Sequence, residues 1–384
     1  MMPVRSLLLV IAFLAQSISI ADDRPWPTGG WEKATPASQN VDVAPLDQLD
    51  NEFASGEHGY IDGMMVFRNG YLVYEKNYEQ DYDKAAERQV QTRGMYQYYD
   101  ADWHPRYQRG PLHTIQSISK SVTSALVGIA IKRGEIPGVE ELMMPYFEDY
   151  DPAIPDARRD SITLRDLLTM TAGIDWDEST TDYTDPLNSA AALESSDDWV
   201  RYVIDLPMRA APGDEYVYNS GITVLISHIL WKATGKHADK YAEEHLFGPL
   251  GIDSYYWKKT PTGLVDTEGG LYLLPGDLAK IGYLYANDGM WDGDRILPNG
   301  WVAASVNPDT EVPGFYARYG YQWWLVPYDG GKDEWAYAGF GYGGQRLLVV
   351  PEYNLIVVFT GWNIYDKPSI DAKAALERVL SALR

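Results

Sequence analysis

Strand-like segments near both ends of the chain, separated by a long helical stretch, constrain the fold more than any other feature of the sequence. Residues 64–74 form two apolar runs around Asn69-Gly70, a dipeptide typical of a tight β-hairpin. Three further β-rich runs lie near the other end, at 321–326, 346–350 and 355–360. The pattern predicts one antiparallel sheet that is closed by the two ends of the chain.

Helical segments fill the middle of the chain. They are expected at 162–173, 199–204, 222–233, 241–247 and 277–285, with a last amphipathic helix at 372–383. The expected fold class is α+β, an antiparallel sheet flanked by helices with an inserted, mainly helical lobe. The α/β lobe would comprise about 49–132 and 270–384, and the helical lobe about 133–269. A cleft between two such lobes is a natural ligand site.

Residues 1–21 have the pattern of a secretory signal peptide. A positively charged start precedes an apolar run over residues 7–15, and Ser19 and Ala21 supply small residues for cleavage. Because the run is too short to span a bilayer comfortably, we expect export to the periplasm or outside the cell, without stable membrane insertion. Residues 22–48 are rich in Pro, Asp and Ala and are expected to be an extended leader on the surface.

Composition excludes several classes of function. The chain carries 55 acidic against 32 basic residues, a formal charge of -23, and such a surface repels nucleic acid and anionic membranes. It has no cysteine, so disulfides and thiolate metal sites are excluded. Its six histidines contain no His-x-x-x-His pair, so no metal site is expected. The motifs described below imply no cofactor either. His113 is expected to have a structural role.

The stretch 116–131 carries the first candidate catalytic residues. Its apolar residues recur at spacings of three and four, the pattern of a helix packed on a core, and Gly134 is expected to end that helix. Ser117 would lie at the helix start, with the Lys120 ammonium one turn on and directed toward its hydroxyl. A serine with a basic partner at the positive end of a helix dipole is a workable nucleophile. An N-capping serine beside a solvated lysine would have the same sequence.

Two further stretches could complete a site. Tyr218 lies on a turn before the 222–233 helix and could reach Ser117, although a tyrosine there can also serve packing alone. Residues 338–345 hold four glycines beside a strand, which allows close approach by a ligand. The edge of such a strand can offer a backbone N–H to a developing oxyanion, while a glycine-rich β-turn is the simpler alternative.

In their order and spacing, these stretches resemble the motifs of the serine β-lactamase and penicillin-binding superfamily. The matching residues are Ser117-x-x-Lys120 for the nucleophile motif, Tyr218-Asn219-Ser220 for the Tyr-x-Asn motif and 341–345 for the glycine-rich strand that stands in for Lys-Thr-Gly. The likeness runs from about residue 62 to the C-terminus and points to the class C-like branch, which holds esterases and 6-aminohexanoate-dimer hydrolases. It implies a β-lactamase/transpeptidase-like fold over residues 49–384.

The resemblance implies a role for each motif residue. Ser117 would be the nucleophile that forms an acyl-enzyme, and Lys120 and Tyr218 would share the proton transfers. Either a neutral Lys120 or an ionised Tyr218 could accept the serine proton, and the sequence leaves this open. Ser220 would hydrogen-bond near Lys120 and help to order it.

The remaining site residues follow from the same resemblance. The backbone N–H groups of Ser117 and Tyr342 would form the oxyanion hole, with Phe340 as the alternative to Tyr342 because the extra glycines make the register ambiguous. The expected pocket walls are Trp176, Tyr183, Gly341 and the aromatic loop around Tyr98.

Two departures from the family pattern bear on the substrate. The lysine of Lys-Thr-Gly is absent, and Ser220 replaces the final Asn of Tyr-x-Asn. Both favour small esters or uncharged linear amides over β-lactams. The alternatives are hydrolysis of β-lactams or D-amino acid peptides and a non-catalytic binding module on the same fold, although a pure binder has no need of a base beside Ser117. The sequence does not define an oligomeric state.

Overall fold

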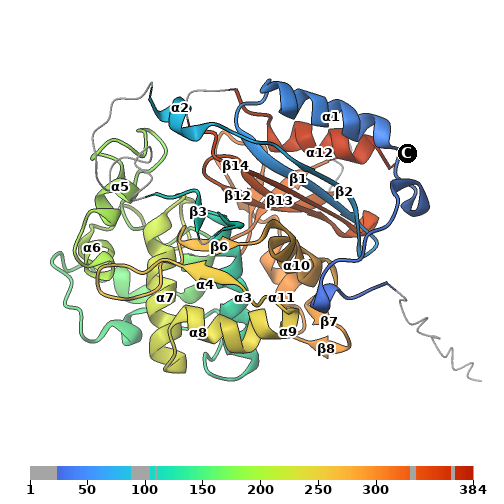
Figure 1. Cartoon of the computed structure of the whole chain (residues 1–384). Coiled ribbons are helices and arrows are strands. Elements are labelled where there is room, and N and C mark those ends of the chain that lie inside the picture. Colours follow the sequence, from blue (N-terminus) through green and yellow to red (C-terminus); the bar gives the residue numbers. More distant parts are fainter. Residues whose placement is uncertain (1–23, 88–103, 109, 329–333, 365–367, 384) are drawn as a thin grey trace, which may run out of the picture.

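The computed structural model of the chain describes residues 24–87, 104–108, 110–328, 334–364 and 368–383 (Figure 1). The expected signal peptide and Tyr98 lie outside this part of the chain. Within the described residues, no helix combines the length and hydrophobicity needed to cross a bilayer.

An eight-stranded antiparallel sheet dominates the larger lobe, in the order β2-β1-β14-β13-β12-β11-β10-β9. Its strands are β1 (Ile61–Arg68), β2 (Tyr71–Asn77), β9 (Thr310–Glu311), β10 (Arg318–Tyr319), β11 (Trp324–Pro327), β12 (Trp335–Gly341), β13 (Gln345–Val350) and β14 (Leu355–Gly361).

Strands from the two ends of the chain meet inside this sheet. β1 pairs with β2 across a tight turn at Asn69 and Gly70, whose φ angles of 53° and 83° are the left-handed conformation that the Asn-Gly dipeptide predicts. On its other side β1 pairs with β14, with Met65 opposite Val358. The predicted antiparallel sheet closed by both ends of the chain is therefore confirmed.

Helices cover both faces of the sheet. On one face α1 (Val43–Ser55) and α12 (Ala372–Ser381) lie side by side (Figure 1). On the other face α10 (Pro275–Ala286) packs on β13 and β14, and α3 (Ile118–Lys132) packs on β12 and β13. Each helix buries an apolar face against the pleated surface, which stabilises both elements.

Helix α1 corrects the predicted leader. The extended leader was expected to reach residue 48, but the helix begins at Val43, where the Asp42 carboxylate accepts the Ala44 N–H at 3.0 Å. Leu46, Leu49 and Phe53, spaced three and four residues apart, are buried under the sheet. This apolar stripe outweighs the Pro- and Asp-rich composition of the segment.

The second lobe and the connections are built mostly from short elements, apart from the long helix α7 (Ser220–Thr234). The short helices are α2 (Tyr82–Ala86), α4 (Leu164–Leu168), α5 (Ser189–Glu194), α6 (Trp199–Asp205), α8 (Ala238–Ala242), α9 (Gly248–Leu250) and α11 (Trp301–Ser305). Two small sheets consist of β3 (Tyr107–Gln108), β4 (Leu112–Thr114), β6 (Leu271–Leu273) and β5 (Tyr255–Trp257), and of β7 (Met290–Trp291) and β8 (Asp294–Arg295). Strand β5 thus lies within the stretch that was expected to be mainly helical.

Helix α3 lies between the lobes and is buried on all sides, not only along the predicted apolar stripe. It contacts β12 and β13 on one side and α7 and α8 on the other. Two of its buried hydroxyls bind backbone carbonyls, because Ser121 donates to the Gln322 carbonyl at 2.7 Å and Thr123 donates to the Ser119 carbonyl at 2.9 Å. The start of α3 is therefore firmly placed at the junction of the two lobes.

Candidate active site

Ser117 lies at the N-terminal end of α3, directly after a strained residue. Gln116 has a φ of 48°, which is uncommon for a residue other than glycine. Its N–H and its side-chain amide donate to Thr114 Oγ1 at 3.3 and 3.1 Å, and its carbonyl accepts Ser119 Oγ at 2.7 Å. These bonds hold the bend, which leaves Ser117 partly exposed at the head of an otherwise buried helix.

Lys120 is almost wholly buried, one turn further along α3. Its Nζ donates to Ser117 Oγ at 2.9 Å and to the Glu268 carbonyl at 2.7 Å. The Glu268 carboxylate lies 3.5 Å away, so the ammonium also has a charged neighbour. The predicted contact between the serine hydroxyl and the lysine amine is thus present.

Tyr218 reaches the same point from the segment before α7. That segment is fixed because the Val217 N–H donates to the Met170 carbonyl at 2.9 Å and Asn219 caps α7. The Tyr218 ring centre lies 5.3 Å from Lys120 Nζ, and its phenol interacts with Ser117. The fold therefore brings the three predicted side chains into one crevice from distant parts of the chain.

The charges around Lys120 favour its ammonium form. Burial by itself lowers the pKa of Lys120, but attraction to the Tyr218 oxygen whenever that phenol is ionised, and to the charges of Glu268 and Glu178, outweighs this, so the pKa lies above its usual value. Burial is also the main reason that the pKa of Tyr218 is raised, since the attraction of Lys120 offsets it only in part. The resting site is consequently an ammonium beside a neutral phenol.

Glu178 is a buried acceptor that sequence reasoning missed. Its carboxylate accepts Trp176 Nε1 at 2.6 Å, the Tyr183 hydroxyl at 3.0 Å, and the N–H and hydroxyl of Ser220 at 2.8 and 3.0 Å. Ser220 was expected to hydrogen-bond near Lys120, and its hydroxyl donates to Glu178, a carboxylate whose charge acts on Lys120. Burial raises the pKa of Glu178, and the charge of Lys120 lowers it in part.

A further buried acid, Asp266, is close enough to Glu268 and Lys120 to be influenced by their charges. Asp266 is 1% exposed, and only one of its carboxylate oxygens has a hydrogen-bond partner, the Gly269 N–H at 3.1 Å. Burial, followed by the charge of Glu268, raises the pKa of Asp266 to about 6, although Lys258 lies 3.8 Å away. This carboxyl therefore titrates in a range where most aspartates are fully ionised.

The glycine-rich turn lies where strand β12 passes the start of α3. A Cβ on Gly341 would come within 2.4 Å of the Ile115 carbonyl oxygen, so only glycine fits there. The Gln345 side-chain amide donates to the Tyr342 carbonyl at 3.2 Å and braces the turn. Both Tyr342 and Phe340 stay candidates for the second N–H of the predicted oxyanion hole.

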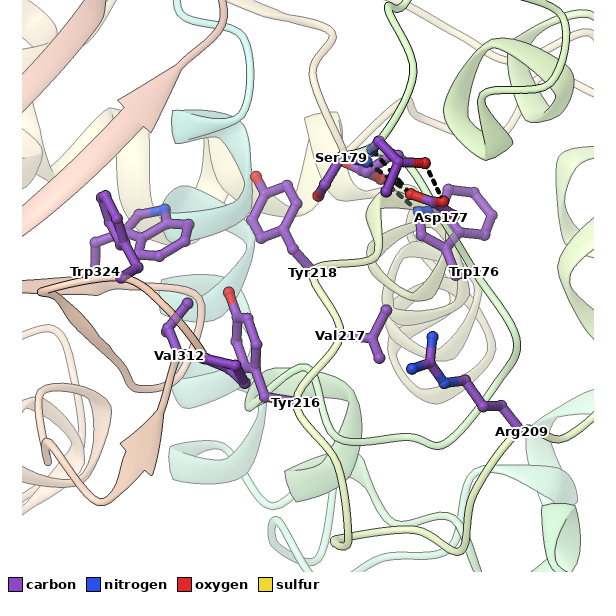
Figure 2. Close-up of a pocket in the computed structure, with 13 residues that line it drawn as sticks. Trp176, Asp177, Ser179, Arg209, Tyr216, Val217, Tyr218, Val312 and Trp324 are labelled. Atoms are coloured by element: carbon purple, nitrogen blue, oxygen red, sulfur yellow. Dashed lines mark hydrogen bonds between the residues drawn. The ribbon is translucent and has the colours of Figure 1, made fainter.

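A cavity of about 670 Å³ opens beside Tyr218. Figure 2 shows Tyr218 between Trp324 on one side and the segment with Trp176 and Ser179 on the other. The walls are mostly aromatic or apolar, from Trp176, Tyr216, Val217, Tyr218, Val312, Pro313, Phe315 and Trp324. The charged groups in the wall are Asp177, Glu178 and Arg209.

The predicted pocket walls agree with this cavity only in part. Trp176 lines it, but Tyr183 and Gly341 do not. Tyr183 lies behind the cavity wall, with its ring centre 4.8 Å from that of Tyr342. Gly341 is packed against the backbone before Ser117. Both residues shape the crevice without lining the cavity.

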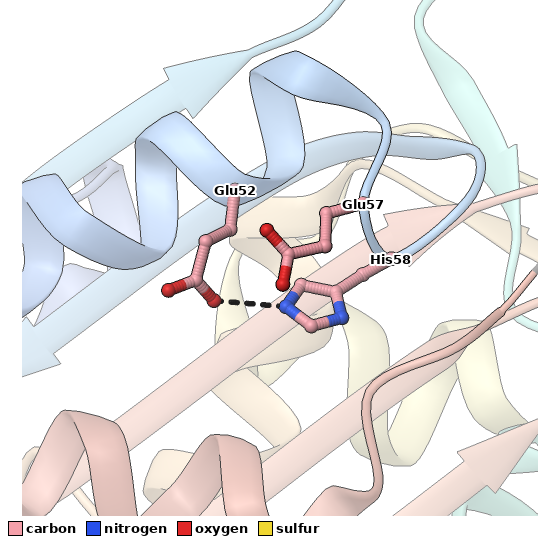
Figure 3. A group of neighbouring side chains, drawn as sticks. All are labelled: Glu52, Glu57 and His58. Atoms are coloured by element: carbon pink, nitrogen blue, oxygen red, sulfur yellow. Dashed lines mark hydrogen bonds and ion pairs between the residues drawn. The ribbon is translucent and has the colours of Figure 1, made fainter.

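One group of potential metal ligands occurs among the described residues, at Glu52, Glu57 and His58 on the far side of the sheet (Figure 3). His58 Nε2 lies 2.9 Å from a Glu52 oxygen, and the Arg378 guanidinium binds the other oxygen of the same carboxylate. A cation of the protein already occupies this group, so it gives no support for a metal site.

The sequence profile of the β-lactamase family matches residues 54–362, which is most of the chain. The chain belongs to the β-lactamase family. The predicted fold and superfamily are therefore confirmed, and the protein is a hydrolase of the serine hydrolase type that this family comprises.

This β-lactamase-family chain is similar to a hydrolase in sequence and to a hydrolase and a penicillin-binding protein in structure. It is 25% identical over 282 residues to the 6-aminohexanoate-dimer hydrolase of Paenarthrobacter ureafaciens, covering 68% of each chain. The structure of EstCE1, a hydrolase with promiscuous acyltransferase activity, matches with a TM-score of 0.65 at 15% identity, over 91% of this chain and 100% of the other. A penicillin-binding protein from Bacillus halodurans matches with a TM-score of 0.61 at 16% identity, over 88% and 98%. The two structures show the shared fold alone.

Sequence reasoning located the three motif residues of this β-lactamase-family chain but not their surroundings. Glu178, Trp324 and Arg209 were missed, because nothing local distinguishes them from other acidic, aromatic and basic residues. The one available signal for Glu178 was its place two residues after Trp176, a residue already expected in the pocket.

Proposed function

We propose that the protein hydrolyses carboxylic esters or linear amides through an acyl-enzyme on Ser117. The observation that supports this most strongly is the 2.9 Å contact between Ser117 Oγ and Lys120 Nζ, with the Tyr218 phenol interacting with both residues. A nucleophile, a cation and a proton carrier in one crevice are what acyl transfer requires.

In acylation, Ser117 Oγ bonds to the substrate carbonyl carbon while Tyr218 carries the proton. The serine proton passes to the Tyr218 oxygen, and the Tyr218 proton passes to the departing oxygen or nitrogen as its bond to carbon breaks. The Lys120 ammonium stabilises the negative charge that develops on the phenol oxygen during this exchange. The raised pKa of Lys120 disfavours a neutral lysine as the base, so we assign the proton transfer to the Tyr218 phenol, which accepts one proton as it gives up another.

Deacylation runs the same path in reverse. A water oxygen attacks the ester carbon of the acyl-enzyme and gives its proton to Tyr218, which returns a proton to Ser117 Oγ as that bond breaks. The backbone N–H of Ser117, with that of Tyr342 or Phe340, would stabilise the oxyanion in both steps, at about 3 kcal/mol per donor.

The cavity beside Tyr218 favours an uncharged substrate. Its one basic residue, Arg209, already pairs with Glu215 at 3.1 Å, while Asp177 and Glu178 add negative charge. An anionic group would be repelled there, whereas an alkyl or aryl group would bury its surface against the aromatic walls. Because Tyr218 forms part of this wall and protonates the leaving group, we place the alcohol or amine portion in the cavity.

The test is hydrolysis of a short-chain p-nitrophenyl ester, together with labelling by a fluorophosphonate probe. Ser117→Ala should abolish both. Retained labelling in that variant would remove Ser117 from its role. A linear amide, nitrocefin and a D-amino acid peptide assayed beside the ester separate the proposed activity from β-lactam or peptidoglycan-type hydrolysis. A chain that no acyl probe labels would instead be a binding module.

We also propose that the protein acts in the periplasm or outside the cell, on the support of residues 1–21 alone. Cell fractionation, with mass spectrometry of the mature N-terminus, tests this directly. A mature chain that retains Met1 in the cytoplasm would contradict it.

A further inference from the structure

Glu178 accepts four hydrogen bonds although only 4% of its surface is exposed. Removing a carboxylate from water costs several kcal/mol unless donors replace the lost hydration. The mechanism proposed above does not use this group. Because burying this carboxylate is costly and the mechanism does not use it, we expect Glu178 to have a separate role beside the crevice.

The four donor groups belong to three residues, which lie on different walls of the crevice. Trp176 lines the cavity, and Ser220 begins α7 two residues after Tyr218. Tyr183 packs its ring on Tyr342 of the glycine-rich turn. The Glu178 carboxylate is thus hydrogen-bonded to three parts of the site. These are the cavity wall at Trp176, the start of α7 next to Tyr218, and Tyr183, which packs on the turn expected to supply the oxyanion hole.

The groups that face Glu178 explain how it also acts through charge. Lys120 approaches from α3, Tyr218 from the segment before α7, and Glu268 from the segment before β6. Tyr183 donates to it directly. Lys120 is the only cation in this set, so the negative charge of Glu178 is balanced chiefly by the ammonium that touches Ser117.

We propose that Glu178 is a positioning residue, which holds Tyr218 in line with Ser117 through Ser220, braces the glycine-rich turn through Tyr183, and balances the charge of Lys120. The inference rests on the proposed hydrolytic function of the same site. It requires no contact between Glu178 and the substrate.

Glu178→Gln provides the central test, because it keeps the shape of the side chain but removes the charge and one acceptor. The amide NH₂ would face donors such as the Ser220 N–H, so Tyr218 should lose its alignment. We expect kcat for the p-nitrophenyl ester to fall by about 10- to 100-fold, with KM changed by less than about threefold. A merely structural loss would lower the amount of active enzyme without changing the pH profile.

The pH profile gives the second readout. The charge of Glu178 raises the pKa of both Lys120 and Tyr218, so its removal lowers them. If activity needs the ammonium and the neutral phenol, the alkaline limb of kcat/KM should move to lower pH in Glu178→Gln. Glu178→Asp keeps the charge, and its alkaline limb should stay near that of the wild-type protein even if kcat falls.

Two single-donor variants keep the inference testable if Glu178→Gln does not fold. Ser220→Ala and Tyr183→Phe each remove one hydrogen bond and leave the carboxylate in place. Each should lower kcat by about fivefold or more without shifting the alkaline limb. Glu75→Gln, the same chemical change on strand β2, is the matched control and should behave as wild type.

The outcomes separate the two proposals. A wild-type protein that hydrolyses no ester or amide and is not labelled at Ser117 overturns the proposed function, and the inference with it. A labelled, active wild-type protein whose Glu178→Gln variant has the same kcat and the same pH profile overturns the inference alone. If Glu178→Gln does not fold, an unchanged kcat in both Ser220→Ala and Tyr183→Phe overturns the inference instead.

Discussion

At the scale of single residues, Lys120 and Tyr218 are expected to act as one unit with Ser117. Lys120→Ala removes the ammonium 2.9 Å from Ser117 Oγ, and Tyr218→Phe removes the proton carrier. Each should lower kcat/KM for the p-nitrophenyl ester by about a hundredfold or more. Because the two act together, the double variant should be little worse than either single one, and steady-state kinetics on all three measure this. Near-normal rates in Tyr218→Phe would show that another group carries the proton.

Asp266 gives a prediction about stability and pH. Its pKa is raised from 3.8 to about 6, so the folded state binds this proton more tightly than the unfolded state. The stability it contributes is fully present below its unfolded pKa and is lost as the pH rises through about 6. Relative to Asp266→Asn, the wild-type free energy of unfolding should fall by on the order of 3 kcal/mol between about pH 4 and pH 7.5.

Urea unfolding of both proteins at the two pH values measures this difference. Asp294→Asn, at an exposed position on β8, is the matched control and should follow the wild-type protein at both pH values. A difference between wild type and Asp266→Asn that does not change with pH would mean that the pKa of Asp266 is the same in the folded and unfolded states.

At the scale of elements, the fit between β12 and the start of α3 is expected to set the rate. A Cβ at Gly341 would lie 2.4 Å from the Ile115 carbonyl oxygen, so Gly341→Ala must push the strand away from Ser117. The oxyanion N–H would move with it, and kcat should fall by about a hundredfold or more. Gly276→Ala is the matched control, because its Cβ would meet nothing closer than 3.5 Å. Equal kcat in both variants would contradict the assignment of this strand to the oxyanion hole.

Elements were predictable from sequence where their signals are local. The Asn69-Gly70 hairpin was correctly expected, because its determinants lie within a few residues. The expected 162–173 helix ends early, at Leu168, since Met170 adopts a left-handed φ of 63° and its carbonyl turns to bind the Val217 N–H. That contact depends on a segment almost fifty residues away, which no local pattern specifies.

At the scale of the whole molecule, the motif residues could be predicted from local sequence, whereas the residues around them could not. Ser117 and Lys120 share one helix turn, so their contact follows from helical spacing. Glu178 differs, because nothing in the sequence marks it as buried among 55 acidic residues, and its hydrogen bonds to Ser220 join positions 42 residues apart. The family motifs predicted that Ser117, Lys120 and Tyr218 would meet. The buried acid Glu178, whose charge acts on Lys120 and Tyr218, could be found only from the structure.

Mutations on the two faces of the large sheet should therefore have different effects. Those on the face covered by α1 and α12 should lower stability, and those on the face covered by α3 should lower activity. Leu376 on α12 is fully buried against the face opposite α3, within the cluster that contains Leu46 and Val357. Leu376→Ala leaves a cavity there and should lower the free energy of unfolding by about 2–5 kcal/mol. Trp324 and Phe340 border this cluster from the side of the crevice, but Tyr218 packs on the other core cluster. We therefore expect kcat of the folded variant to stay within about twofold of wild type. Urea unfolding and the ester assay test both statements, with the half-exposed Glu377→Ala as the matched control. A large fall in kcat at full stability would show that the helix-covered face and the crevice are energetically coupled through the sheet.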